Sequence, residues 1–327
     1  MSKSKKKQKT LISRSKNQKL ISKHRKKNQR LMSKSRILLA VFAVLCILAS
    51  FGIAIYPTVS DYYYSLVHKH TIADYSVQVE KMEDDNIEEI FSGAREYNEY
   101  LLNAGKHPSQ EPDENEIERY NQLLNIDVGG VMGYIRIPAI SVFLPIYHGS
   151  DENVLQVGVG HMPLSSFPIG GEGTHCVLTG HSGLPSASLF TNLDQLKEGD
   201  IFTITVLKEV LTYEVDQILV VLPNDMGALS IEPGKDYCTL VTCTPYGVNT
   251  HRLLVRGHRI ETKEEEAKEI KKVASNIKSV PLIDSRINPI IPAVVLITDV
   301  FAVCIALVGL KKKKKSSRKK RKSSRRR

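Results

Sequence analysis

Two long apolar runs lie near the ends of this 327-residue chain. Residues 37–56 contain no charge, and residues 289–310 are interrupted only by Pro292 and Asp299. Because about 20 apolar residues in a helix cross the hydrocarbon core of a bilayer, each run is long enough to span a membrane. The pattern therefore predicts two transmembrane helices with a large body between them.

Asp299 is unusual inside such a run. A charged side chain near the bilayer centre is costly, and it is a functional-site hypothesis by default. A tilted helix, or a partner helix such as the first span, would also accommodate it. The sequence leaves both interpretations open.

Between the spans the pattern changes twice. Residues 61–125 mix Ile and Leu with Tyr, Glu and Asn, which predicts polar helices, and the two prolines within residues 106–113 break that stretch. From Val131 onward, short alternating or apolar runs are separated by Gly and Pro, which is typical of strands. Strands are predicted at Val131–Ile137, Val142–Tyr147, Thr174–Thr179, Ile201–Leu207, Leu211–Val221, Tyr237–Thr242 and Arg252–Ile260.

Helices are predicted to be minor in this second region. Short helices are expected at Asp151–Val157 and Ser188–Leu196, and a charged helix at Thr262–Ser279 leads to the second span. Several strands with only short helices predict a mainly β fold, either a closed barrel or a sandwich of roughly 130 residues.

Charge is segregated along the chain. Residues 1–36 carry 15 Lys and Arg and residues 311–327 carry 13, and neither segment has an acidic residue. The residues between them hold 18 basic and all 35 acidic side chains, a net charge of −17. The overall formal charge of +11 therefore belongs to two cationic tails, and the body is acidic.

Each cationic tail adjoins an apolar run, which predicts the topology. Lys- and Arg-rich flanks of spanning helices stay in the cytoplasm, so both termini are expected inside and residues 57–288 outside. The first run is too long for a good cleavable signal peptide. Nucleic-acid binding is the alternative interpretation of such tails, but their position beside the spans favours anchoring near anionic lipid instead.

Candidate chemistry lies where predicted strands end. The run Thr239-Leu-Val-Thr-Cys243 delivers a cysteine to a strand end, and Arg252 returns nine residues later, after a turn that contains Pro and Gly. Upstream, a strand-like run from Cys176 ends on His181 in a Gly-rich turn, where the backbone can present an exposed side chain. A thiol is nucleophilic only as the thiolate and needs a base or cation nearby. The pattern predicts a Cys/His/Arg acyl-transfer site.

Arg252 has two candidate roles at such a site. With reference pKa values near ~8.5 for a free cysteine and ~6.5 for a free histidine, the neutral pair is favoured by about 2.7 kcal/mol, so a nearby charge would help to form the thiolate. The guanidinium could also stabilise a tetrahedral oxyanion. A solvated arginine on a strand is the plain alternative.

Metal and cofactor binding are not predicted. No Cys or His pair has ligand-like spacing with a partner pair elsewhere in the chain. Cys46 and Cys304 fall within the apolar runs, where a free cysteine packs as a small apolar side chain.

These motifs resemble those of sortases, the membrane-bound transpeptidases of Gram-positive bacteria. Thr239–Cys243 followed by Arg252, with Thr179-Gly-His181 upstream, carries the family likeness. The continuous stretch Cys243-Thr-Pro-Tyr-Gly-Val-Asn-Thr-His-Arg-Leu-Leu-Val-Arg-Gly257 resembles the pilus-building class C enzymes more specifically. The likeness covers about residues 55–310.

The resemblance implies a closed eight-stranded β-barrel with short helices, preceded by a helical segment and flanked by the two spans. It divides the chain into a basic cytoplasmic tail (1–36), a transmembrane helix (37–56), an extracellular helical segment with the lid region (57–128), the barrel (129–262), a helical linker (263–288), a second transmembrane helix (289–310) and a second basic cytoplasmic tail (311–327).

The resemblance also implies the roles of the site residues. Cys243 would be the nucleophile, His181 the acid and base, and Arg252 the holder of the oxyanion or the substrate, with no metal. The first partner is an LPXTG-tailed pilin or surface protein, cleaved between Thr and Gly to leave a thioester on Cys243. The second is a pilin lysine amine, which resolves the thioester as an isopeptide bond at the outer face of the cell membrane.

Three alternatives stay open. A housekeeping sortase would use a peptidoglycan amine as the acceptor and anchor surface proteins to the wall. A hydrolytic cysteine protease would pass the thioester to water. A non-catalytic surface assembly scaffold would require the Cys/His/Arg set to be accidental. The two anchors and the Cys-Thr-Pro-Tyr-Gly run favour pilus assembly.

One segment departs from the class C pattern. Many class C enzymes cover the cysteine with a lid that carries Asp-Pro-aromatic in the part matching residues 105–120. This chain has Glu111-Pro112-Asp113 there, with no aromatic residue after a proline. No lid residue is therefore assigned.

The remaining cysteines of the body are spaced regularly. Cys176 lies five residues before His181, and Cys238 lies five before Cys243. On parallel, level strands the two would be neighbours, and the offset of five would put them on the face opposite the site. Buried free thiols are expected there, and a disulfide is the alternative.

Overall fold

The computed structural model describes residues 2–126 and 129–276, which fall into one unit up to Ile55 and another from Tyr56 onward. The described part of the first unit belongs to α1 (Ser2–Lys81). From Leu38, α1 is the one described helix that is long and apolar enough to cross a membrane. This agrees with the first predicted span, whereas the span at 289–310, its Asp299 and the tail at 311–327 lie outside the described residues.

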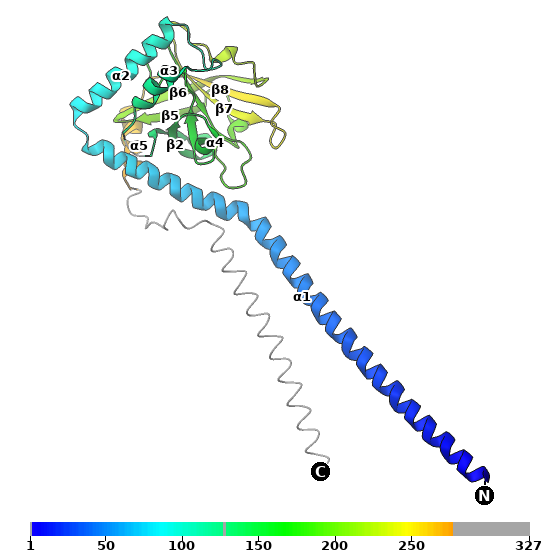
Figure 1. The fold of residues 1–327 in the computed structure, drawn as a ribbon. Coiled ribbons are helices and arrows are strands. Elements are labelled where there is room, and N and C mark those ends of the chain that lie inside the picture. The colour runs from blue at the N-terminus through cyan, green and yellow to red at the C-terminus, as the bar shows by residue number, and fades with distance from the viewer. Residues whose placement is uncertain (1, 127–128, 277–327) are drawn as a thin grey trace. The chain divides into compact units, whose positions relative to one another are not determined.

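The second unit contains a closed barrel of eight strands (Figure 1). Its strands neighbour one another in the order β1-β2-β3-β4-β7-β8-β6-β5. Two neighbouring pairs, β2 with β3 and β4 with β7, are parallel, and the others are antiparallel. The strands are β1 (Val131–Ile137), β2 (Val142–His148), β3 (Val159–His161), β4 (Thr174–Thr179), β5 (Ile201–Val206), β6 (Glu209–Val221), β7 (Asp236–Thr244) and β8 (His251–Ile260).

The barrel confirms the seven predicted strands and resolves the choice between barrel and sandwich. The strand that the sequence pattern missed is β3, which has three residues and is too short to show an alternation. It nevertheless closes the barrel, because it pairs with β2 on one side and β4 on the other.

Helices precede, interrupt and follow the strands of this barrel in the chain. The predicted break at 106–113 is confirmed, because α2 ends at Asn103 and α3 begins after its N-cap, Asp113, whose carboxylate accepts from the Glu116 amide. A short helix also forms as expected within residues 151–157. The helices after α1 are α2 (Asp84–Asn103), α3 (Glu114–Gln122), α4 (Glu152–Leu155) and α5 (Glu264–Asn276), with single 3-10 turns η1 (Pro138–Ile140), η2 (Leu193–Gln195) and η3 (Gly227–Leu229).

The predicted helix at Ser188–Leu196 is wrong. Only η2 forms there, although Leu189, Phe190 and Leu193 have the spacing of a buried helical face. Leu189 has a positive φ of 34°, which a right-handed helix cannot contain. The apolar side chains instead enter the core from a turn.

The end of α1 packs into the barrel domain. Buried residues recur at helical spacing along it, among them His68, Ile72, Tyr75 and Val79. The Tyr75 hydroxyl donates to the Met132 carbonyl at 2.9 Å and accepts from the Leu207 amide at 2.7 Å. This part of α1 therefore belongs to the body that carries the site.

Candidate active site

Two parallel neighbours in the barrel, β4 and β7, end side by side. Thr179 at the end of β4 pairs with Val241 of β7, and the Gly180 amide, one residue further, donates to the Val241 carbonyl at 3.1 Å. Extending this register by two residues brings His181 level with Cys243. The predicted base and the predicted nucleophile therefore lie at the same end of the barrel.

The predicted cation is placed by the antiparallel pair of β7 and β8. Cys243 and Arg252 are paired directly across these strands. Opposed residues of this kind point to the same face, with Cβ atoms roughly 4.5–5.5 Å apart. The structure thus brings together all three residues that the sequence singled out.

The Arg252 side chain is held by the preceding loop. Its Nη1 donates to the carbonyl oxygens of Asn249 at 3.3 Å and His251 at 3.1 Å. Among residues 2–126 and 129–276, no carboxylate forms an ion pair with it. The charge of this half-buried guanidinium is therefore available to a substrate oxygen.

Cys176 and Cys238 lie on the inner face of the barrel. They are register partners on β4 and β7, are 2% and 0% exposed, and are free thiols. They belong to the main core, whereas Val241, two residues before Cys243, belongs to a separate cluster on the outer face. The expectation of neighbouring buried free thiols opposite the site is confirmed.

The turn that carries His181 is tied to its surroundings. The Phe190 amide donates to the His181 carbonyl at 3.1 Å, and the Gly183 amide donates to Thr191 Oγ1 at 3.0 Å. Gly183 has φ of +81°, and a Cβ there would lie 3.0 Å from the ring of Tyr246 in the β7–β8 loop. Only glycine suits both the conformation and this approach.

Helix α1 contacts two chain segments near His181, the turn that follows it and the residues that follow α4. The Asp61 carboxylate accepts from the Ser188 amide at 2.7 Å, within the turn after His181. Seven residues further along the same helix, His68 Nε2 donates to the Val157 carbonyl at 2.8 Å, just after α4. The helix that continues from the predicted span is thus part of the support of the site.

Sequence reasoning missed a carboxylate beside His181. Glu152 of α4 places Oε2 at 3.4 Å from His181 Nε2, and its Oε1 accepts from Gln156 Nε2 at 2.5 Å. These contacts, the Gln156 hydrogen bond first and the histidine second, lower the pKa of Glu152. No motif joins the two residues in sequence, because their contact depends on how α4 is folded before β3.

The face that carries Cys243 continues into a buried apolar cluster. Leu229 of η3, in the β6–β7 connection, packs with Val177, Val241 and Leu254 from β4, β7 and β8. The β6–β7 connection therefore covers the outer face of the sheet next to the site.

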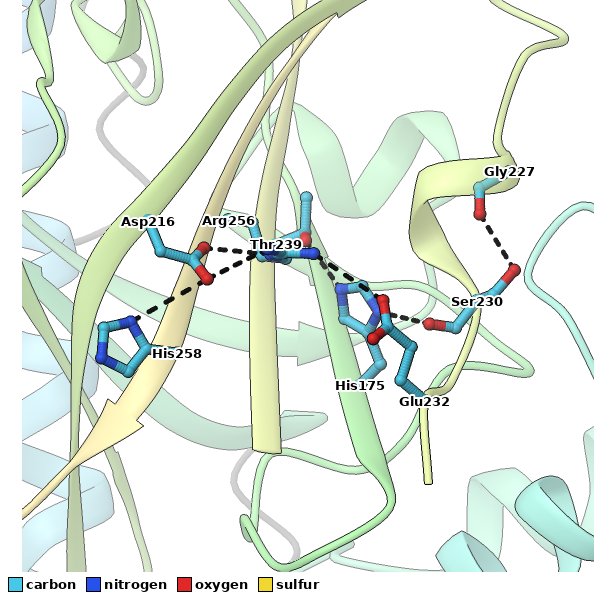
Figure 2. Close-up of polar contacts among 8 residues, drawn as sticks. All are labelled: His175, Asp216, Gly227, Ser230, Glu232, Thr239, Arg256 and His258. Carbon is cyan, nitrogen blue, oxygen red and sulfur yellow. Dashed lines mark hydrogen bonds and ion pairs between the residues drawn. The ribbon is translucent and has the colours of Figure 1, made fainter. Parts of the chain in front are cut away.

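A polar network on the same face helps to hold this connection (Figure 2). Arg256 Nε and Nη2 each donate at 3.0 Å to Asp216 of β6, and Arg256 Nη1 lies 3.9 Å from Glu232 in the connection. The guanidinium also stacks on Tyr237, with 4.1 Å between its carbon and the ring centroid. Arg256 thus links β8 to β6 and to the connection.

His175 of β4 is the second link in this network. Its Nδ1 donates to the Ser230 carbonyl at 2.8 Å, and its Nε2 accepts from Thr239 Oγ1 at 2.7 Å. Nε2 can accept only when the ring is neutral. Burial, the main cause, lowers the pKa of His175 to about 4, so the ring is neutral at ordinary pH.

This buried ring predicts a loss of stability in acid. Because an unfolded histidine has a pKa near ~6.5, the unfolded chain binds the extra proton between pH ~6.5 and the folded pKa of about 4. The contribution of His175 is therefore complete above about pH 6.5, falls by about 2 kcal/mol at about pH 5, and stops falling below the folded pKa.

Urea unfolding of the detergent-solubilised chain, followed by tyrosine fluorescence, measures this loss. Between about pH 7.5 and pH 5, wild type should lose about 2 kcal/mol more unfolding free energy than His175→Gln. Equal losses in the two proteins would show that His175 does not supply the proton uptake.

The segment that matches the lid region is tied to α2 and α3. Lys106 Nζ lies 2.5 Å from Glu116 Oε1, and the Tyr100 hydroxyl donates to the same oxygen at 2.8 Å. The side chain of Cys243 is half-buried. These contacts do not identify a lid residue, so none is assigned.

A thiol, an imidazole and a guanidinium at one end of the barrel are groups that can serve as nucleophile, base and oxyanion donor in acyl transfer through a thioester. Within the described part of the chain, no group of three or more His, Cys, Asp or Glu side chains is arranged to hold a metal ion.

Comparison with known proteins assigns the family. The sortase domain model matches residues 135–260. Sortase C1 of Streptococcus agalactiae is 50% identical, with 59% of this chain and 100% of that one covered at a TM-score of 0.58. A Clostridium perfringens sortase C, solved with the C-terminal cell wall sorting motif, is 42% identical (59% and 99% covered, TM-score 0.52).

A pilus-related sortase C of Group B Streptococcus is also 42% identical (58% and 97% covered, TM-score 0.51). The chain spans only 66% of the length of the curated Bacillus subtilis sortase D, to which it is 29% identical. It spans 55% of a Streptococcus agalactiae sortase A, to which it is 33% identical. Each match covers 41% of this chain. The closed barrel agrees with these matches. The chain belongs to the sortase family of cysteine transpeptidases.

Proposed function

We propose that this chain cleaves an LPXTG-like sorting signal through a thioester on Cys243 and joins the cut end to a lysine amine of a pilin. The observation that carries the proposal is the direct pairing of Cys243 with Arg252 at the level of His181. A nucleophile, a base and an oxyanion donor are then available to one carbonyl group.

The first half-reaction forms the thioester. His181 takes the proton of the Cys243 thiol, and the sulfur attacks the carbonyl carbon of the Thr–Gly bond. Arg252 donates to the oxygen that becomes negative in the tetrahedral intermediate. The C–N bond then breaks, His181 returns its proton to the leaving glycine amine, and the threonine carbonyl stays on the sulfur.

The second half-reaction returns the free enzyme. The acceptor amine attacks the thioester carbonyl, the C–S bond breaks, and an isopeptide bond forms. A lysine that enters as the ammonium loses two protons in this step. One passes through His181 to the sulfur of Cys243, and the other is released to water.

The acceptor is assigned to pilin on the likeness to class C enzymes. The stretch from Cys243 to Gly257 carries this likeness, and a similar solved structure is described as a pilus-related sortase C. Transfer to a peptidoglycan amine is the second candidate, since sortase A enzymes are among the curated relatives.

The proposed location is the cell membrane, with the barrel outside and both termini in the cytoplasm. Exposed apolar side chains along α1, from Leu38 to Ile55, support the first anchor. The basic segments at residues 1–36 and 311–327 adjoin the predicted spans, and such flanks stay in the cytoplasm, which supports the orientation.

Product analysis tests the acceptor. The full chain in lipid nanodiscs is incubated with an LPXTG-tailed pilin, and the products are separated on denaturing gels. Pilus assembly predicts covalent ladders that survive boiling in SDS and contain a Thr–Lys isopeptide bond by mass spectrometry. Cleaved monomer alone would contradict pilin polymerisation, and efficient transfer only to a peptidoglycan stem-peptide amine would favour the housekeeping function.

A further inference from the structure

We propose that the Glu152 carboxylate receives the ammonium group of the acceptor lysine. This assignment rests on the proposed function, because it places the acceptor in the second half-reaction at the same site. The side chain of Glu152 is 69% exposed and lies beside His181, the group that must take the amine proton. An incoming amine can therefore reach the carboxylate and the base together.

The carboxylate is held in place although it is exposed. Gln156 Nε2 donates to Oε1 at 2.5 Å, which directs Oε2 toward His181. The short turn that carries Glu152 is capped by Asp151, whose Oδ1 accepts from the Asn153 amide at 2.9 Å. A carboxylate fixed in this way binds a cation with less loss of side-chain entropy than a free one.

The facing nitrogen of His181 is not engaged elsewhere. Its Nε2 is buried and has no hydrogen-bond partner in the part of the chain that the structure describes. The 3.4 Å approach to Glu152 is an ion-pair distance without hydrogen-bond geometry. An ammonium group that binds Glu152 would enter the surroundings of this nitrogen.

In the second half-reaction, the acceptor lysine must be bound and must lose a proton before it can attack. A lysine amine is almost entirely protonated near neutral pH, and only the neutral form attacks a carbonyl. A carboxylate binds the ammonium form, and an adjacent neutral imidazole removes a proton from it. After thioester formation His181 is neutral again, so it is ready for this step.

Other charged groups near the site do not fill this role. Arg252 is a cation and repels an ammonium group. Asp61 is engaged by the Ser188 amide, and Asp151 by the amides of its own turn. Glu152 is therefore the carboxylate that pairs with His181 in the described structure.

The Glu152→Gln variant of the full chain in nanodiscs tests the proposal. The acyl-enzyme is formed with a sorting-signal peptide and resolved with either a lysine-containing peptide or hydroxylamine, which is uncharged at neutral pH. The KM for the lysine peptide should rise about tenfold, as expected for loss of one charge-assisted contact. Thioester formation and the hydroxylamine reaction should stay within about twofold of wild type.

The matched control is Glu198→Gln, which removes another exposed carboxylate and should change neither reaction. Equal slowing with the lysine peptide and hydroxylamine would overturn the proposal, because it would show that Glu152 only orients His181. An unchanged KM for the lysine peptide would overturn it as well. A wild-type chain that forms no thioester would instead overturn the proposed function, and this assignment with it.

Discussion

Replacing Cys243 with alanine is expected to abolish both half-reactions, with a loss of turnover on the order of 10⁶-fold, as for removal of other catalytic nucleophiles. Without the sulfur there is no thioester, and therefore nothing for the acceptor amine to resolve. The residue is half-buried near the end of β7, so removal of one atom leaves the barrel core intact. Cleavage of a sorting-signal peptide by the purified chain and pilin polymerisation are the two measurements.

Cys176→Ala is the matched control for this loss. That thiol is also in the body but lies in the barrel core, on the other face of the sheet. The variant should keep turnover within a few-fold of wild type, as long as its melting temperature shows that it is folded. Measurable turnover by Cys243→Ala, above the level of a heat-inactivated sample, would remove Cys243 from the mechanism.

Arg252→Ala is expected to lower kcat by roughly 10²–10³-fold, the usual result of removing one donor to a developing oxyanion. The direct pairing with Cys243 places the guanidinium where the attacked carbonyl oxygen would lie. Because this contact strengthens only as the oxygen becomes negative, KM should change little. Arg252→Lys keeps the charge but not the planar donor set, so it should recover part of the rate.

Arg136→Ala in β1 is the control, since it removes a half-buried arginine from a strand that is not a neighbour of β7 or β8. Single-turnover measurement of thioester formation separates oxyanion stabilisation by Arg252 from substrate holding. A rise in KM with unchanged kcat would assign Arg252 to substrate holding and would contradict the oxyanion role.

How much of the site the sequence could predict depends on how far apart in the chain the residues of each contact lie. Cys243 and Arg252 are close in sequence, and a turn between two strand-like runs is enough to set them opposite each other. The position of His181 depended on the parallel pairing of β4 with β7, which the pattern of apolar residues does not specify. The resemblance to sortases supplied what the local pattern lacked.

Other features lay beyond the reach of a local pattern. The three residues of β3 are too few to show alternation, yet barrel closure depends on them. Leu189 and its neighbours had helical spacing, but a positive φ at Leu189 turned the chain. Glu152 meets His181 only through tertiary packing, and the same holds for the contact of Asp61 with the following turn.

Trapping the acyl-enzyme tests the role of Cys243 most directly. The full chain is mixed with an LPXTG peptide, quenched in acid, and examined by intact-mass and peptide mass spectrometry. The expected result is a mass gain equal to the peptide acid up to its threonine less one water, located on Cys243 and removed by hydroxylamine. The absence of any adduct while the peptide is being cleaved, or an adduct on another residue, would contradict thioester catalysis at this site.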